Sequence, residues 1–450
     1  MHIRLKIIYM KQTLSSLFDR NNPKQMLLNG IFVLFLISLL SRIVLQLFSM
    51  ANYGGTKDYE DWLISEFLIN YQGGFVRRGL MGEILFFFAK HFNIDVVWTI
   101  KIFCLVCFVS VCIFFVKSFL KKGYSLYILP LCFFLSGNIL FAGWIRKDCL
   151  FFCFFIPILW LYHKSNLSIM IKLLLINVLS VFIILSHEVF AFFALPILFL
   201  LFFNQYKSKG ILLSVVLSLL CLLPSIFAFF LVFRMHGNPE IAQAIWDSWM
   251  AILNQETSNI GKAVDAISWS SKSTFALHLK GNFLSVDQRV LSLLIWVITF
   301  PVVYYISTNA LLAFRKNEND FTNRHKTVLS SVLIFQLLCL SPVFVVLSCD
   351  YLRVFFYWIT SSFTVFLLIP IDEIEKLFPA VFVHLVKRIN KMLTNILQPS
   401  KTTLFFLMIF IGIANSSFTI EMAYKATVIY NVLVLLSQPL IFLFSLLHLM

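Results

Sequence analysis

The chain contains little charge and no long polar segment. Only 13% of its 450 residues are Asp, Glu, Lys or Arg, whereas 60% are apolar. A soluble domain needs polar side chains over most of its surface, and this chain does not supply enough of them. The longest segment between apolar runs is residues 235–288, so we expect no separate soluble domain. Residues 1–450 are expected to form a single membrane domain.

Two other features are absent. Residues 1–26 form a basic tail, but the apolar run at 27–49 is too long for the core of a signal peptide, and no small-residue cleavage site follows it. Nearly all of the nine cysteines fall within apolar runs, where they act as small buried hydrophobes rather than disulfide partners. The basic residues behind the net charge of +15 are scattered over short loops, where the positive-inside rule accounts for them. We therefore expect no nucleic acid as a partner.

Apolar runs, in contrast, are abundant. A helix needs about 20 residues to cross a hydrocarbon core of about 30 Å. We count twelve such runs, at residues 27–49, 96–116, 124–142, 149–163, 171–186, 189–204, 211–233, 290–313, 328–348, 353–370, 402–419 and 428–449. The sequence therefore predicts an all-α, polytopic integral membrane protein with about twelve transmembrane helices.

The basic residues indicate how these helices are oriented. Lys and Arg total 21 in one set of alternating loops and 13 in the other, longer set. Because cytoplasmic loops carry the excess of Lys and Arg, the first set is expected in the cytoplasm. That set includes the tail at 1–26 and the loop at 371–401, and it places both termini inside. The loops at 50–95 and 235–288 are then periplasmic.

Nearly every unusual polar cluster falls in the predicted periplasmic loops. Ionisable groups at a membrane boundary are costly to keep, so a group of them indicates a site. If residues 57–70 form a helix, Asp58 and Asp61 share one face, opposite an apolar stripe. Such an interfacial helix would present paired carboxylates for catalysis. The structural alternative is that Thr56 caps this helix and that the acids interact with its dipole.

The stretch GGFVRRG comes next in the same loop. Its glycines, Gly73, Gly74 and Gly79, let a backbone approach a ligand closely. The guanidinium groups of Arg77 and Arg78 match a phosphate in two-point fashion, which favours a diphosphate ligand. Anchoring to lipid headgroups is the alternative for paired arginines.

Two further clusters stand in very short predicted turns. Arg146 and Lys147 can extend an anion site, with a local ion pair to Asp148 as the alternative. His187 and Glu188 lie where one apolar run turns into the next, which makes a solvated surface role a poor explanation for them. A zinc site needs three or four ligands, so two adjacent ones do not predict a metal.

The last cluster lies at the outer end of the tenth predicted helix. Asp350 and Arg353 are three residues apart and therefore share a helical face. They can form a structural ion pair. In the functional alternative, Arg353 pairs with Asp350 in the empty protein and is released to bind phosphate.

The loop at 235–288 contains a possible surface helix, PEIAQAIWDSWMAIL. Its large apolar side chains are spaced to lie on one face; they are Ile241, Ile245, Trp246, Trp249 and Met250. The helix is either a flap over a lipid-linked substrate or a helix that simply rests on the membrane.

Together these stretches resemble a known class of enzymes. GGFVRRGL, IRKD, SHEVFAFF and DYLRVFFYW, combined with an acidic outer loop directly after the first helix, resemble the GT-C class of polyprenol-dependent glycosyltransferases. The narrower resemblance is to the Wzy-type O-antigen and capsular polysaccharide polymerases. It spans roughly residues 27–370 and implies a GT-C-like bundle with interfacial helices in the first outer loop. The long arginine-rich outer loops frequent in such polymerases are not evident here.

The resemblance implies polymerisation of undecaprenyl-diphosphate-linked repeat units into O-antigen or capsular polysaccharide. The reaction would take place at the periplasmic face of the bacterial inner membrane, without a cofactor. Arg77, Arg78 and Arg353 would hold the departing diphosphate. The expected partners are the lipid-linked glycan and membrane lipid, with a chain-length regulator and a flippase as protein partners.

The same resemblance implies a general base for the acceptor hydroxyl. The candidates are Asp58, Asp61 and Glu188, with His187 nearby. An alcohol nucleophile needs such a base, and an anionic leaving group needs preorganised cations.

Two other functions remain open. A GT-C transferase that adds a single sugar from a polyprenyl-phosphate donor would use a divalent metal, bound by carboxylates such as Asp58 and Asp61. A lipid-linked oligosaccharide flippase would place charges along a central cavity, often with repeat symmetry, and neither feature is clear in this sequence.

The orientation can be tested with single cysteines in a cysteine-free background. Asn319 is expected in the cytoplasm, whereas Ser268 and Gly73 are expected on the other side. An impermeant thiol reagent should therefore label the Ser268→Cys variant and not the Asn319→Cys variant in intact spheroplasts. The reverse pattern would place the candidate site in the cytoplasm.

Overall fold

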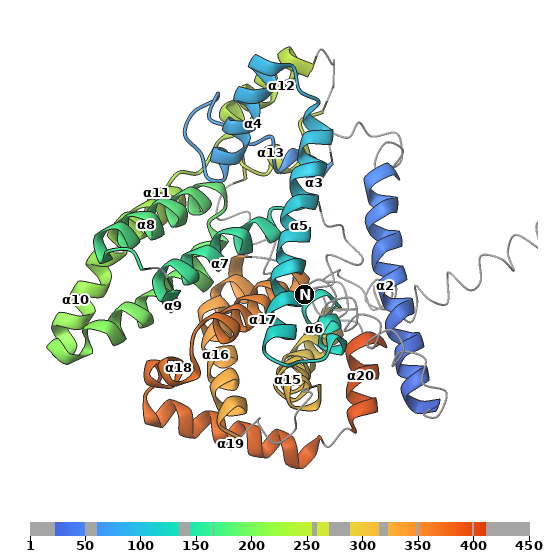
Figure 1. Cartoon of the computed structure of the whole chain (residues 1–450). Coiled ribbons are helices and arrows are strands. Elements are labelled where there is room, and N and C mark those ends of the chain that lie inside the picture. Colours follow the sequence, from blue (N-terminus) through green and yellow to red (C-terminus); the bar gives the residue numbers. More distant parts are fainter. Residues whose placement is uncertain are drawn as a thin grey trace, which may run out of the picture.

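The computed structural model describes residues 23–49, 61–134, 145–164, 166–253, 259–269, 289–314, 323–347, 351–397 and 400–410. Within these ranges every regular element is helical and there is no strand. The all-α prediction is therefore confirmed. Figure 1 shows a bundle of helices with additional short helices at both of its ends.

Four helices in the described ranges are long and apolar enough to cross a membrane. They are α5 (Val96–Lys121), α8 (Ile169–Ser186), α9 (Val189–Tyr206) extended by the turn that follows it, and α16 (Asn323–Pro342). A fifth candidate consists of α10 (Ile211–Cys221) and α11 (Leu223–Arg234), which are bent by 65° at their junction. Pro224 lies at this break, and a proline interrupts the hydrogen-bond ladder of a helix.

The remaining predicted runs also coincide with helices where they are described. These helices are α2 (Pro23–Ser49), α6 (Leu129–Phe134), α7 (Asp148–Lys164), α15 (Arg289–Ala313), α17 (Tyr351–Leu368) and α20 (Lys401–Phe410). The run at 428–449 lies outside the described residues, as do parts of those at 124–142 and 402–419. The total of twelve spans therefore stays a prediction.

Aromatic side chains fill the interior of the bundle. Helix α7 packs against α5, α8 and α17. Its Phe152 stacks on Phe193 of α9 and meets Phe356 of α17 edge to face, with ring centroids 5.6 and 5.2 Å apart. Such pairs favour one mutual orientation of the rings beyond simple burial. The cysteines of the described ranges are free thiols, and Cys107 and Cys149 are buried in this core.

Four short elements gather at one end of the bundle and form a helical cap (Figure 1). They are α3 (Trp62–Ser65), α4 (Gly79–Phe92), α12 (Pro239–Leu253) and α13 (Lys262–Asp265). The cap has its own apolar core, to which the segment after α3 contributes Phe67 and Leu68. The described parts of the two predicted periplasmic loops, 50–95 and 235–288, are thus packed against each other.

Helix α12 is the surface helix that the sequence predicted. Its Ile245, Trp246 and Trp249 are buried against the rest of the cap. The indole Nε1 of Trp249 donates a hydrogen bond of 2.6 Å to the carbonyl oxygen of Leu68, and the ring meets Phe86 edge to face. The apolar face of α12 therefore packs on protein and does not rest on the membrane.

The prediction of a helix over residues 57–70 is wrong in its described part. Helix α3 ends at Ser65, and residues 68–70 have no regular structure. The segment is held instead by tertiary hydrogen bonds: the Ser65 hydroxyl accepts from the backbone N–H of Ala263, and Leu68 accepts from Trp249. These partners come from the loop at 235–288, so no local pattern reveals them.

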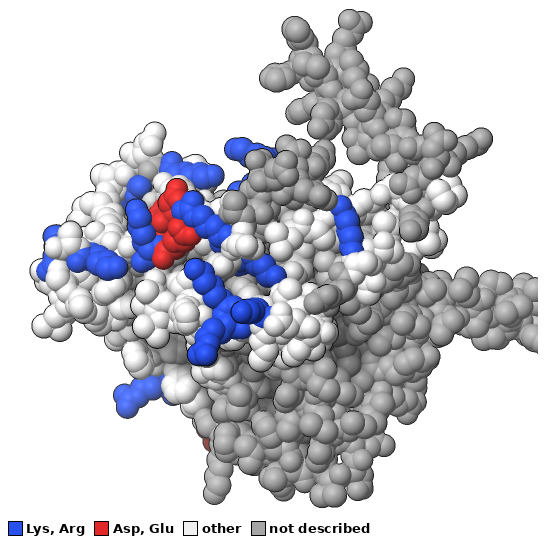
Figure 2. All heavy atoms as spheres, turned by 90° about the horizontal axis from the view of Figure 1, so that it is seen from below, with Lys and Arg blue, Asp and Glu red and all other residues white. Residues whose placement is uncertain are grey.

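The other end of the bundle carries α18 (Ile371–Leu377) and α19 (Ala380–Ile396). Seen from this side, Lys and Arg side chains lie around a small acidic patch (Figure 2). Asp372 and Glu375 of α18 both pair with Arg324 of α16. The predicted cytoplasmic loop at 371–401 is thus largely helical.

The close contact between α4 and the segment after α3 requires a residue without a Cβ atom at Gly82, which can be tested. A Cβ atom at Gly82 would lie 1.9 Å from the carbonyl oxygen of Ile69, whereas one at Gly30 of α2 would meet nothing within 4 Å. Since backbone atoms cannot move aside as side chains do, Gly82→Ala should lower the free energy of unfolding by about 2 kcal/mol or more. Gly30→Ala is the matched control and should cause no loss. Thermal unfolding of the two variants in detergent, followed by size exclusion, measures the difference, and equal stability would refute the close packing.

Candidate functional site

Beneath the helical cap lies a group of charged side chains that we call the buried charge cluster. It comprises Glu66, Arg78, Lys147, Asp148, His187, Glu188 and Arg353. Its members come from segments far apart in the chain. They meet because each lies at or next to a helix end at the boundary between the cap and the bundle: Glu66 and Arg78 on the side of the cap, and the others on the side of the bundle.

The local structure explains these positions. Asp148 is the first residue of α7, and Arg353 lies in the first turn of α17. His187 and Glu188 form the whole connection between α8 and α9, so their side chains stay at the helix ends. Arg78 precedes α4 with φ of 67°, the left-handed region that side chains other than glycine rarely adopt. Such backbone strain persists only where the surroundings hold it.

Two arginines in the cluster are bound by carboxylates. The guanidinium group of Arg78 contacts Glu188 through Nε at 3.0 and 3.1 Å and through Nη2 at 2.6 Å. That of Arg353 contacts Asp148 through Nε at 3.0 and 3.1 Å and through Nη2 at 2.7 Å. The hydroxyl of Tyr357 also donates to Asp148. The carboxylates Glu188 and Asp148 are therefore engaged in two-point ion pairs.

Glu66 is different from these two carboxylates. Its side chain is only 1% exposed, yet neither of its oxygens accepts a hydrogen bond from a described residue. The closest cationic groups are His187 Nε2 at 3.6 Å and Arg353 Nη2 at 3.7 Å from Oε1, distances too long for hydrogen bonds. An unsatisfied buried carboxylate is unfavourable by itself, so this position indicates a missing hydrogen-bond donor.

The charge state of Glu66 follows from its surroundings. Burial raises the pKa of this carboxyl, but the positive charges of Arg353, Lys147 and Arg78, together with the neighbouring imidazole of His187, outweigh burial and lower the pKa to about 2. Glu66 is therefore ionised at neutral pH. Its negatively charged carboxylate is surrounded by cations, and its oxygens accept no hydrogen bond from a described residue.

His187 lies between Glu66 and Glu188 and is buried. Burial and Arg78 lower its pKa well below the usual value, against the opposite effect of the two glutamates. The ring is thus neutral at pH 7. Its Nδ1 accepts from the backbone N–H of Val189 at 3.3 Å, which places the proton on Nε2, facing Glu66.

Lys147 is the most deeply buried cation of the cluster. Its Nζ donates to the carbonyl oxygens of Arg78 at 3.3 Å and Ser186 at 3.5 Å and lies 5.4 Å from the ring centre of Phe67. Burial lowers the pKa of Lys147 to about 8, against the attraction of Glu66. Its bond to the Arg78 carbonyl helps to hold the left-handed backbone there.

Arg77 adds a positive charge without a partner among the described residues. Its guanidinium group is partly exposed, and no described carboxylate lies within ion-pair distance of it. Burial and the neighbouring Arg78 lower its pKa, but a guanidinium group stays charged. The cations Arg77, Arg78, Lys147 and Arg353 thus outnumber the carboxylates Glu66, Asp148 and Glu188, which favours an anionic ligand.

The structure brings together many of the residues that the sequence singled out. Arg78, Lys147, His187, Glu188 and Arg353 lie in the cluster, and Arg77 and Arg146 lie next to its members in the chain. Within the short turn, Lys147 donates to carbonyl groups, whereas Asp148 binds Arg353 and also feels the positive charge of Arg146.

Asp58 and Asp61, the acids predicted to act in the first outer loop, are not among the described members of the cluster. Asp61 is half-buried in front of α3 and its side chain makes no capping hydrogen bond. Asp58 and Asp350 lie outside the described residues. The paired presentation of Asp58 and Asp61 on one helix therefore stays a prediction, although the helix over 57–70 does not form beyond Ser65.

Sequence reasoning missed Glu66, Asp148 as a partner of Arg353, and Tyr357. Glu66 carries a signal that could have revealed it. It is the single acid in the stretch WLISEFLINY, and a lone acid within an apolar segment indicates either a buried partner or a site. Nothing in the sequence connects Asp148 with Arg353, which lies 205 residues further along.

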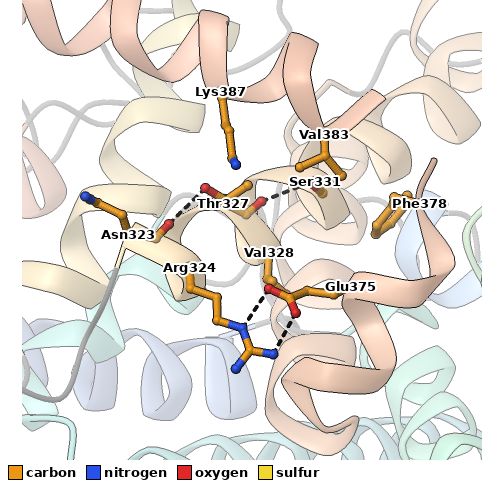
Figure 3. A pocket seen from close by; sticks show the side chains of 9 residues that line it. All are labelled: Asn323, Arg324, Thr327, Val328, Ser331, Glu375, Phe378, Val383 and Lys387. Atoms are coloured by element: carbon orange, nitrogen blue, oxygen red, sulfur yellow. Dashed lines mark hydrogen bonds and ion pairs between the residues drawn. The ribbon is translucent and has the colours of Figure 1, made fainter. Parts of the chain in front are cut away.

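A separate cavity of about 250 Å³ lies between α16, α18 and α19, at the end away from the cap. Figure 3 shows Arg324 and Glu375 paired at its edge. It shares no residue with the buried charge cluster. Among the described residues, no group of three or more His, Cys, Asp or Glu side chains is placed to hold a metal ion.

Comparison with known proteins gives no further guide. No protein-family profile matches the chain, and neither a curated protein nor a solved structure is significantly similar to it.

The ion pair between Arg78 and Glu188 can be compared with an exposed pair of similar geometry, Arg324 and Glu375. Removing one partner of a largely buried pair leaves a poorly compensated charge and should destabilise by about 3 kcal/mol, whereas an exposed pair is screened by solvent and contributes far less. In a double-mutant cycle, Arg78→Met combined with Glu188→Gln should therefore show a large coupling. Arg324→Met with Glu375→Gln should show almost none. Similar couplings in thermal unfolding would contradict the burial of the cluster.

Proposed function

We propose that the protein is a membrane glycosyltransferase that polymerises undecaprenyl-diphosphate-linked repeat units into O-antigen or capsular polysaccharide. The observation that carries the proposal is the Glu66 carboxylate, which is buried, lacks hydrogen-bond donors among the described residues and is surrounded by cations. In the predicted orientation the cluster faces the periplasm, and the protein is embedded in the bacterial inner membrane.

Glu66 replaces Asp58, Asp61 and Glu188 as the favoured general base. A base must come within about 3 Å of the hydroxyl proton that it removes. Glu188 and Asp148 have their oxygens bound by arginines, whereas both oxygens of Glu66 can accept. An acceptor sugar hydroxyl is the kind of donor that this carboxylate lacks.

The reaction can be written with its protons and electrons balanced. The acceptor hydroxyl oxygen attacks the anomeric carbon of the lipid-linked glycan, and its proton passes to Glu66. The bond between the anomeric carbon and the diphosphate oxygen breaks, and the diphosphate leaves with the electron pair. At this site, Arg77 and Lys147 are not paired with a described carboxylate and would receive this charge. Arg78 and Arg353 stand beside them in their ion pairs.

Because the pKa of Glu66 is low, its strength as a base depends on whether the diphosphate donor is bound. With a pKa of about 2, the carboxylate of the empty protein holds a proton too weakly to act as an effective base. A bound diphosphate offsets the same positive charges that lower this pKa, so the pKa rises when the donor is present. Proton removal is then favoured only in the loaded enzyme.

A transferase that adds a single sugar from a polyprenyl-phosphate donor is the alternative. It would use the same face of the membrane, and a divalent metal would neutralise its leaving group. The excess of cations in the cluster favours the diphosphate donor, because these cations supply the charge that the metal would otherwise bring.

The proposal predicts that Glu66→Gln lowers the rate of glycan transfer about 100-fold or more, because the variant lacks the general base. The assay uses purified protein in proteoliposomes with lipid-linked repeat units, and the products are resolved as a ladder on a gel. Glu83→Gln is the matched control, since Glu83 lies in α4 and binds Tyr71 and Gln72 outside the cluster. Full activity of Glu66→Gln, with its unfolding temperature unchanged, would remove Glu66 from the reaction.

The same assay separates the two donors. Wild-type protein should extend the repeats in EDTA, because the cations of the cluster replace a metal. Strict dependence on a divalent metal, together with transfer of one sugar per acceptor, would favour the single-sugar transferase.

A further inference from the structure

Helix α19 is placed differently from the candidate spans. It runs across the end of the bundle opposite to the helical cap, below α16, whereas α16 and α5 run along the bundle (Figure 1). It packs against α15 and α16. A helix in this position lies near the plane in which the spans leave the membrane.

One face of α19 is fixed to the bundle. Val386 and Leu393 are buried. The side-chain oxygen of Asn390 accepts from the hydroxyl of Tyr304 at 2.7 Å, and Asn390 also bonds to Ser330. These polar contacts anchor the middle of the helix to α15 and α16, so its other faces keep a defined direction.

A second face of α19 is apolar and exposed. Val381, Leu385, Met392 and Ile396 are 83%, 52%, 56% and 69% exposed. Their spacing of four, seven and four residues places them in one stripe along the helix. Helix faces that meet water are normally polar, so a continuous exposed apolar stripe indicates a contact surface.

A basic flank borders this apolar stripe. At about 100° per residue, Arg388 falls at the edge of the stripe, beside Val381 in projection, and Lys391 lies about 60° further around the helix, away from the stripe. Both side chains are exposed. An apolar stripe edged by Lys and Arg is typical of helices that lie in the interface of a membrane with anionic lipids.

The far flank of α19 is polar. Lys387 and Val383 line the cavity described above together with Thr327 and Ser331 of α16 (Figure 3). This flank faces away from the apolar stripe and offers hydroxyl and ammonium groups suited to water. The helix thus has a lipid-compatible side and an aqueous side.

We propose that α19 is an in-plane membrane helix that binds an anionic phospholipid surface. Val381, Leu385, Met392 and Ile396 enter the boundary between headgroups and acyl chains, and Arg388 and Lys391 bind the phosphates of anionic headgroups. The helix holds the ends of α15 and α16 at a fixed depth in the bilayer. The proposal depends on neither the sugar chemistry nor the buried charge cluster.

The test uses the full-length chain in nanodiscs of phosphatidylglycerol and phosphatidylcholine. A photoreactive p-benzoylphenylalanine replaces Leu385 or Met392 in the apolar stripe, and Thr394 on the polar side as the matched control. All three positions are exposed, so the substitutions do not disturb the core. Mass spectrometry after irradiation identifies what each position touches.

Lipid adducts are expected at positions 385 and 392 and not at 394. Phosphatidylglycerol should be enriched among these adducts, on the order of fivefold for each cation that binds it, and Arg388→Gln with Lys391→Gln should remove the enrichment. Cross-links to another segment of the chain or to a second copy would overturn the proposal. So would equal lipid adducts at all three positions, or adducts that merely follow the bulk lipid composition.

Discussion

The constraint on which this structure depends is the desolvation of charge. Glu66, Lys147, Asp148 and His187 are buried beneath the helical cap, and removing such groups from water is unfavourable unless opposite charges and hydrogen bonds replace the solvent. Each charge in the cluster therefore requires a partner from another element. Arg353 joins α17 to α7, and Arg78 joins the start of α4 to the connection between α8 and α9. The same pairs that make burial tolerable fix where the cap sits on the bundle.

Glu66 distinguishes this site, because its carboxylate lacks hydrogen-bond donors among the described residues. In the cluster, Glu188 and Asp148 accept hydrogen bonds from arginines through both oxygens, whereas Glu66 keeps both oxygens without a donor among the described residues. The surrounding cations hold it ionised, with its pKa lowered to about 2 despite burial. In the proposed function, this single imbalance prepares the site for a hydroxyl on one side and for an anion on the other. The cap supplies the enclosure, because Trp249 of α12 is hydrogen-bonded to the loop that carries Glu66.

The charged side chains at the two ends of the molecule differ in their exposure to solvent. Beneath the cap, charges are buried and paired across long separations in sequence. At the far end, Arg324, Asp372 and Glu375 form an exposed network that solvent can replace, and α19 exposes an apolar stripe instead of covering it. The buried network and the apolar, basic-flanked helix thus lie at opposite ends of the bundle, as do the reaction and the lipid contact that we propose for them.

The sequence by itself determined the class of fold and where the apolar helices of the described ranges lie, because the need to satisfy backbone hydrogen bonds in an apolar medium acts locally and leaves a pattern in every run. It also pointed to Arg78, His187, Glu188 and Arg353, since charges beside apolar runs stand out along the chain. It did not reveal the bond between Asp148 and Arg353, the end of α3 at Ser65 or the central place of Glu66. Only the tertiary structure decided these, because ion pairs and loop conformations depend on groups brought together across as many as 205 residues, and no local periodicity records such a meeting.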